Sequence, residues 1–179
     1  NVARAETNYQ PPKKLIYAKV GDAELSLNVL TPKVKANGLG IIVVASGAGY
    51  AGGGKVNAQE DTRIADIFCR RGYTIFAVRP GPITKYSVID MADHLQKAIV
   101  FVKEHANDYQ VDSGRLGLMS TRGGVHLVCL NCITASDKTA VKAAGVYIPP
   151  TDLDDKDAQK LYVQADTAAW EQIRKEAFQ

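Results

Sequence analysis

Cysteine is scarce in this chain of 179 residues, which contains Cys69, Cys129 and Cys132 alone. An odd number of cysteines argues against a dedicated disulfide framework. Cys129 and Cys132 form a C-x-x-C pair, but it lies inside a predicted helix and not at a helix N-terminus, where a redox-active thiolate is stabilised. We therefore expect both to be buried small side chains. Neither a second cysteine pair nor a histidine cluster is present to complete a zinc site, so we expect no metal and no cofactor.

Long apolar runs are also missing. The longest, such as residues 39–45, are far shorter than the roughly 20 residues that a membrane-spanning helix needs, so we expect no membrane span. The 22 Lys and Arg residues and 19 Asp and Glu residues give a net charge of +3. These charges are scattered and are not interleaved with aromatic residues, as a nucleic-acid surface would require. We expect no nucleic-acid partner.

The composition is otherwise that of an ordinary globular protein, with 46% hydrophobic and 23% charged residues. Such a chain has enough apolar material for one core, which predicts a single domain over residues 1–179. Within this domain we expect residues 1–13 to form an extended N-terminal arm. The polar pattern over residues 155–179 is typical of a helical C-terminal segment.

Alternating and continuous apolar patterns define the first half of the chain. Residues 14–19 and 23–30 alternate and flank Gly21-Asp22, which predicts an antiparallel hairpin. The β-branched run over residues 39–45 is typical of a strand buried on both faces. Residues 59–71 follow as a helix with Ile64, Ile67 and Phe68 on one face, ending before Gly72.

The second half alternates between strands and helices. A strand is predicted over residues 74–78, and Ser87 with Asp90 then forms a capping box that opens a long helix. Strands over residues 115–119 and 143–148 flank a helix over residues 124–135. This alternation predicts an α/β fold in which a mostly parallel sheet has helices on both faces and an antiparallel hairpin at its N-terminal end. The inner face of the long helix is predicted to carry Val88, Met91, Leu95, Ile99 and Val102.

Residues 116–127 read LGLMSTRGGVHL, which resembles the nucleophile elbow of the α/β-hydrolase family. That elbow carries Gly-x-Ser-x-Gly between a strand and a helix. Aligned on Gly124 and His126, Ser120 occupies the place of the first glycine, Arg122 that of the serine nucleophile and Gly124 that of the last glycine.

Two further motifs resemble the same family in its carboxylesterase and lipase branch. Residues 44–50, VASGAGY, are similar to the His-Gly-Gly-Gly-Trp oxyanion loop, and residues 148–153, IPPTDL, are similar to a strand-end Pro-Thr-Asp-Leu. The resemblance implies that the backbone N–H groups of Gly47, Ala48 and Gly123 face the substrate's carbonyl oxygen. It also implies a carboxylic ester as the substrate class. Together with the absent initiator Met, it favours an exported or periplasmic location.

The triad that the resemblance implies is incomplete. The guanidinium of Arg122 stays protonated and cannot attack a carbonyl. His126 is the last histidine, and in the family pattern that histidine is not the general base. The two strands that normally carry the acid and the base do not follow, so the fold is expected to be C-terminally short. Ser120 is an alternative nucleophile without a partner base, and Asp152 is a strand-end residue.

The remaining polar residues near these motifs have structural interpretations. The hydroxyls of Ser120 and Thr121 are expected to bond to nearby backbone. His94 and His105 lie on the predicted long helix, where a surface or packing role is expected.

Three functions stay open beside an esterase-like protein that is inactive or incomplete. Arg122, Gly123 and Gly124 could hold an anion at a helix N-terminus. Residues 49–55 fit the phosphate-binding pattern G-x-x-x-x-G-K, but Val56 stands where Ser or Thr should bind Mg²⁺. The strand over residues 143–148 could be a sheet edge that pairs with a second copy or with a partner protein.

Overall fold

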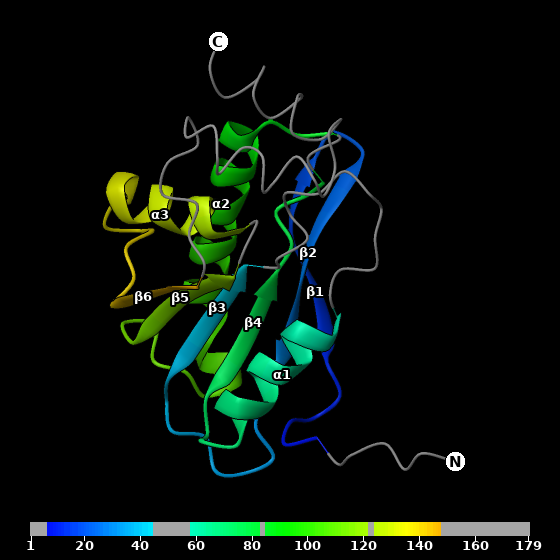
Figure 1. Cartoon of the computed structure of the whole chain (residues 1–179), viewed down its shortest axis with the longest axis vertical. Coiled ribbons are helices and arrows are strands. Elements are labelled where there is room, and N and C mark those ends of the chain that lie inside the picture. Colours follow the sequence, from blue (N-terminus) through cyan, green and yellow to red (C-terminus); the bar gives the residue numbers. More distant parts are fainter. Residues whose placement is uncertain (1–6, 45–57, 83–84, 122–123, 148–179) are drawn as a thin grey trace.

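The computed structural model describes residues 7–44, 58–82, 85–121 and 124–147, with residues 58–62 described by their backbone alone. Six strands form one sheet in the order β1-β2-β4-β3-β5-β6 (Figure 1). β1 pairs antiparallel with β2, β2 pairs antiparallel with β4, and β3 to β6 run parallel. The predicted parallel sheet with an N-terminal antiparallel hairpin is confirmed. The strands are β1 Lys13–Val20, β2 Ala23–Leu30, β3 Gly40–Val44, β4 Thr74–Val78, β5 Leu116–Thr121 and β6 Ala143–Tyr147.

Helices cover both faces of the sheet. α1 (Ala58–Cys69) lies on one face, while α2 (Val88–His105) and α3 (Val125–Thr134) lie on the other (Figure 1). A short 3₁₀ helix, η2 (Ala106–Tyr109), follows α2. β3 and β4 are buried along their whole length, because each is covered on both faces. Alternate residues of β3 therefore pack in opposite directions, with Ile41 towards α1 and Ile42 towards α2.

α2 begins with the predicted capping box. The Ser87 hydroxyl accepts a hydrogen bond from the Asp90 N–H at 3.1 Å, and Asp90 Oδ2 accepts one from the Ser87 N–H at 3.0 Å. The Ser87 hydroxyl also donates to Asp90 Oδ2 at 2.8 Å. This hydrogen bond and the one from the Ser87 N–H stabilise the charged carboxylate and hold the pKa of Asp90 below its usual range. The helix buries one long face against the sheet, made of Met91, His94, Leu95, Ala98, Ile99 and Val102.

The inner face of α1 differs from the prediction. Ile67 was expected to face the core, yet it is 49% exposed, while Ala65 and Cys69 are fully buried. Ile64 and Phe68 pack against this buried cluster as expected. Small side chains at positions 65 and 69 let the helix approach the sheet closely, which turns Ile67 towards solvent.

The expected burial of Cys129 and Cys132 is wrong, because both side chains are exposed. α3 instead buries Val125, Leu127, Val128 and Asn131. This helix is apolar around most of its circumference, so the sequence pattern did not indicate which side faces the sheet.

The last strand of the described sheet, β6, is exposed at all five of its residues.

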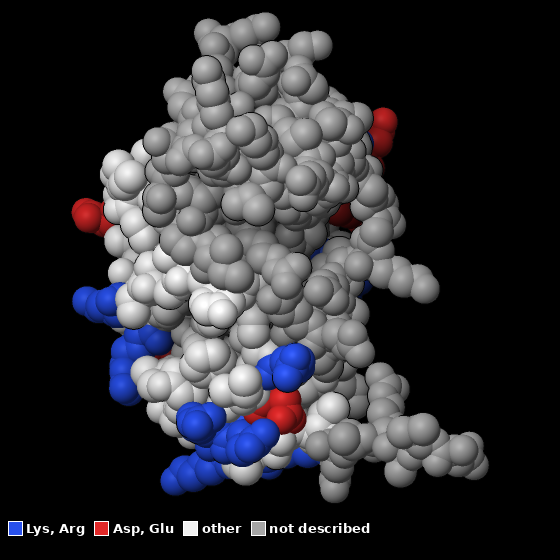
Figure 2. Space-filling model, viewed as in Figure 1, with Lys and Arg blue, Asp and Glu red and all other residues white. Residues whose placement is uncertain are grey.

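Lys and Arg side chains gather at the lower end of the face seen in Figure 2, where the parallel strands of Figure 1 begin. Within the described parts of the chain, no helix combines the length and the apolar character that crossing a membrane requires.

Candidate active site

The two strands that lead into the oxyanion-loop motif and the elbow end next to each other. β3 and β5 are neighbouring parallel strands, and Val44 at the end of β3 is in register with Ser120 near the end of β5. The chain therefore leaves both strands at the same carboxyl edge. β5 ends at Thr121 and α3 begins at Val125, so a helix follows the strand after three residues, as predicted.

Ser120 ties the ends of these two strands together. Its side chain is fully buried, and its Oγ donates a hydrogen bond to the Val44 carbonyl oxygen at 2.9 Å. The same Oγ lies 3.4 Å from the Thr121 carbonyl oxygen. A buried hydroxyl that donates its proton to a backbone carbonyl is held in a structural role and does not face a substrate.

Gly124 lets the start of α3 pack directly against the two strand ends. A Cβ at this position would lie 2.4 Å from Ser120 Oγ, 3.1 Å from Val44 Cγ1 and 3.2 Å from the Val44 carbonyl oxygen. No other residue type fits this space unchanged. The elbow resemblance indicated a glycine at this position, and the structure supplies the reason.

The first turn of α3 contains no acidic side chain. The N-cap of this helix is Gly124, which offers no side-chain hydrogen bond. The first N–H groups of a helix carry a partial positive charge and seek acceptors. This arrangement, placed beside the end of β3, suits an anion or a polarised carbonyl oxygen.

His126 lies in the first turn of α3, and its side chain is partly buried. Burial lowers its pKa below 6.5, because a charged imidazole would lose its hydration there. Its Nδ1 is buried and has no hydrogen-bond partner within the described residues. A positive charge near a helix N-terminus would be unfavourable as well.

The burial of His126 predicts a pH-dependent stability. The unfolded chain binds a proton at His126 more tightly than the folded chain does, so the free energy of unfolding should fall as pH drops below about 6.5. For one proton the slope cannot exceed about 1.4 kcal/mol per pH unit. Urea unfolding between pH 5 and 8 should show the free energy of unfolding of the native chain falling as the pH is lowered. The fall should be smaller in His126→Gln.

A matched control is His105→Gln, since His105 is exposed and pairs with Asp108 at 3.1 Å on the far end of α2. This variant should keep the slope of the native chain. An unchanged slope in His126→Gln would contradict the burial argument.

The other two histidines stand apart from Ser120. His94 is buried on α2, and its Nδ1 donates a hydrogen bond to the Pro80 carbonyl oxygen at 2.7 Å. Its ring meets Tyr86 edge-on at 4.7 Å. His94 thereby holds the turn that follows β4. Packing and surface roles account for His94 and His105 respectively.

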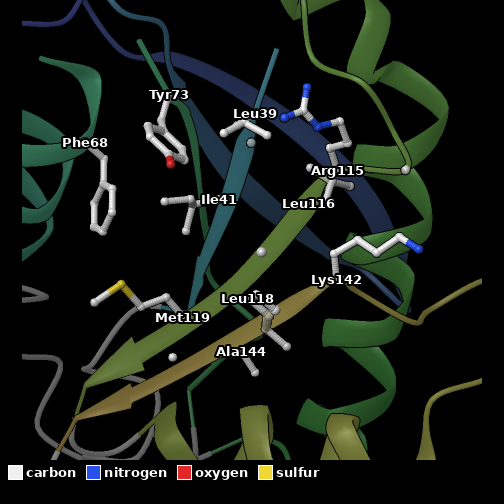
Figure 3. A pocket seen from close by; sticks show the side chains of 15 residues that line it. Leu39, Ile41, Phe68, Tyr73, Arg115, Leu116, Leu118, Met119, Lys142 and Ala144 are labelled. Carbon is white, nitrogen blue, oxygen red and sulfur yellow. The ribbon is translucent and has the colours of Figure 1, made fainter. Parts of the chain in front are cut away.

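A groove on the α1 face of the sheet was not predicted from the sequence (Figure 3). It has a volume of about 560 Å³, and Phe68 and Tyr73 form one wall. Its floor is low because neither Gly117 nor Gly145 has a side chain, and a Cβ on either would lie at least 3.7 Å from its neighbours. The groove exists because small residues of two strands become neighbours through the β5–β6 register, which sequence spacing does not show.

The structure brings together Ser120 and Gly124 among the predicted site residues. Arg122 and Gly123 lie outside the described residues, as do Gly47 and Ala48. The motif over residues 148–153 and the G-x-x-x-x-G-K loop over residues 49–55 also lie outside them.

A family model described as BD-FAE matches residues 27–170, which is more than half of the chain. No curated protein matches the chain in sequence.

Several solved esterase structures share the fold. A bacterial heroin esterase has a TM-score of 0.70 at 18% identity, with 88% of this chain and 50% of that chain covered. Thermogutta terrifontis esterase 2 phosphonylated by sarin has a TM-score of 0.65 at 16% identity, with 86% and 62% covered. An arylesterase has a TM-score of 0.62 at 21% identity, with 80% and 46% covered. The chain thus spans about half to three fifths of the length of these structures.

Proposed function

This chain belongs to the BD-FAE family and has the fold of the α/β-hydrolase esterases, and we propose that the carboxyl edge of its sheet binds a small carboxylate or ester without hydrolysing it. The observation that carries the proposal is the close approach of Gly124 to Ser120 and Val44, which places the N-terminus of α3 at the ends of β3 and β5.

The absence of a nucleophile at position 122 supports binding over hydrolysis. Arg122 stands where the family has its serine, and a guanidinium has no lone pair to offer a carbonyl carbon. The neighbouring hydroxyl of Ser120 is buried and donates to Val44. Thr121 is also buried. No described hydroxyl at this edge is therefore both exposed and placed beside a base.

Charge supports an anionic ligand. The guanidinium of Arg122 immediately precedes the N-terminus of α3 in the sequence, and both favour a carboxylate. The oxyanion-loop motif over residues 44–50 begins at Val44, the last residue of β3, which lies against Gly124. Its backbone donors would hold the second carboxylate oxygen, or the carbonyl oxygen of an ester.

Calorimetric titration with acetate, phosphate and succinate tests this proposal. We expect the native chain to bind at least one of these anions, and Arg122→Ala to weaken binding by about 10- to 100-fold, the effect of losing one charged hydrogen bond. Arg115→Ala is the matched control, because Arg115 is exposed and precedes the amino end of β5, and it should bind like the native chain.

Two outcomes would contradict the proposal. The first is the absence of binding heat in the native chain, or equal heat in Arg122→Ala. The second is that the native chain hydrolyses p-nitrophenyl acetate faster than buffer alone and that Ser120→Ala abolishes this hydrolysis. Such a result would make Ser120 a nucleophile.

The exposed edge of β6 favours a second role, and we propose that it pairs with a second copy of the chain. All five residues are exposed, and Tyr147 is 64% exposed despite its large ring. An edge strand with small residues and no inward charge is a template for pairing with another strand. Light scattering should give the mass of a dimer for the native chain and that of a monomer for Val146→Lys. A native chain that stays monomeric at all concentrations would contradict this pairing.

A further inference from the structure

We propose that Cys129 and Cys132 form a two-thiolate site for a soft monovalent metal ion of the Cu(I) type on the outer face of α3. Both thiols are free and exposed, and they lie three residues apart within a regular helix. Residues at this spacing share one face of a helix, with their Cβ atoms about 5–6 Å apart. The two thiols are therefore neighbours that solvent can reach.

The third cysteine does not compete for such an ion. Cys69 is the last residue of α1 and is fully buried, and its Sγ lies 3.6 Å from the Leu30 carbonyl oxygen. Burial, with a smaller contribution from the nearby Asp66 carboxylate, raises its pKa to about 12. Since a thiolate is the form that binds metals, Cys69 stays out of reach and unreactive.

The spacing on the helix suits a bridging ion better than a disulfide. A disulfide needs Cβ atoms about 3.5–4.5 Å apart, so closing one here would distort α3. Two metal–thiolate bonds of about 2.3 Å, the length found for zinc, span a wider gap than one S–S bond does. A metal ion can therefore join Cys129 and Cys132 while the helix keeps its geometry.

The number of ligands selects the type of ion. All three cysteines and all three histidines of the sequence fall within the described residues. Among those residues, no group of three or more His, Cys, Asp or Glu side chains is placed to share a metal ion. His126 precedes Cys129 by three residues, but it does not form such a group with Cys129 and Cys132. Structural zinc requires four ligands, whereas soft thiolates select Cu(I), which is satisfied by two.

Binding involves no change of oxidation state. Each thiol loses one proton, two sulfur–metal bonds form, and two protons are released for each Cu(I) bound.

The test is an anaerobic titration of the chain with Cu(I) in competition with the chromophoric chelator bicinchoninate. We expect one Cu(I) per chain and two protons released per ion. Loss of a residue that only hydrogen-bonds to a metal ligand weakens metal binding roughly 10- to 100-fold. Cys129→Ser and Cys132→Ser each remove a ligand itself, so each should weaken Cu(I) binding by more than this. Failure of the native chain to compete with the chelator, or one equivalent still bound by the double serine variant, would overturn the proposal.

Two variants with the same number of thiols test the role of the helix face. Cys132→Ser/Ile133→Cys moves the second thiol to an exposed position four residues from Cys129, where position 133 is 83% exposed, and it should still bind one Cu(I). Leu130→Cys/Cys132→Ser places the thiols on adjacent residues that do not face each other, and it should lose the tight site. Equal binding by both variants would show that the helix face does not make the site.

Discussion

Replacing Gly124 with alanine is expected to lower the free energy of unfolding by about 2–4 kcal/mol, the sum of overpacking and a lost buried hydrogen bond. The new Cβ would lie 2.4 Å from Ser120 Oγ, so the serine side chain must turn away from the Val44 carbonyl oxygen that it now contacts at 2.9 Å. The Val44 side chain, 3.1 Å from the new Cβ, must also move. Urea unfolding followed by circular dichroism measures the change.

A double-mutant cycle with Ser120→Gly isolates the cause of this loss. Ser120→Gly removes the closest contact, so Gly124→Ala should cost at least about 1 kcal/mol less in that background than in the native chain. The contacts with Val44 remain in both backgrounds, so the rescue should be partial. Additive effects of the two substitutions would show that Ser120 and Gly124 do not share the space described.

The second prediction compares two glycines on neighbouring strands. Gly40→Ala should destabilise the chain by about 1–3 kcal/mol, because its Cβ would meet Leu116 Cδ2 at 2.6 Å and Val111 Cγ1 at 2.9 Å inside the core. Gly117→Ala should instead stabilise it by about 0.5–1 kcal/mol, since nothing lies within 3.7 Å and alanine restricts the unfolded chain more than glycine does.

Both changes add one methyl group to a strand of the same sheet, and β3 and β5 pair directly. The difference between them therefore reports the side of the sheet onto which each Cβ would project. Gly40 projects into the packed core, and Gly117 projects into the groove of Figure 3. The urea concentrations at the unfolding midpoints measure the difference in stability, provided that the free energy of unfolding depends equally steeply on urea in both variants. Similar losses of stability in both variants would mean that the groove is already filled.

Local patterns accounted for most of the secondary structure. The hairpin strands, the buried run of β3 and the capping box of α2 were all predicted, because each depends on residues close together in the chain. The inner faces of α1 and α3 were less accessible to such reasoning. Ile67 was assigned to the core from its place on the apolar face of a helix, and Cys129 and Cys132 were expected to be buried because they lie inside a helix and not at its N-terminus. Which side of each helix is buried depends on how it packs against the sheet.

In the candidate site, too, the sequence predicted the local features and not the contacts between distant residues. The sequence of the elbow pointed to a strand, a turn and a helix, and to glycine at position 124. It did not show that the Ser120 hydroxyl bonds to Val44, 76 residues earlier in the chain, because that contact depends on the parallel register of β3 with β5. The register also decides that Gly124 must be glycine at this place.

By itself the sequence determined the order of strands and helices and the resemblance to the family, since each depends on residues close together in the chain. The tertiary structure decided which of the described residues line the groove and which are exposed, as in β6 and at Cys129 and Cys132 of α3. The physical reason is that exposure depends on what packs opposite a residue, and in a sheet that partner comes from a strand distant in the chain.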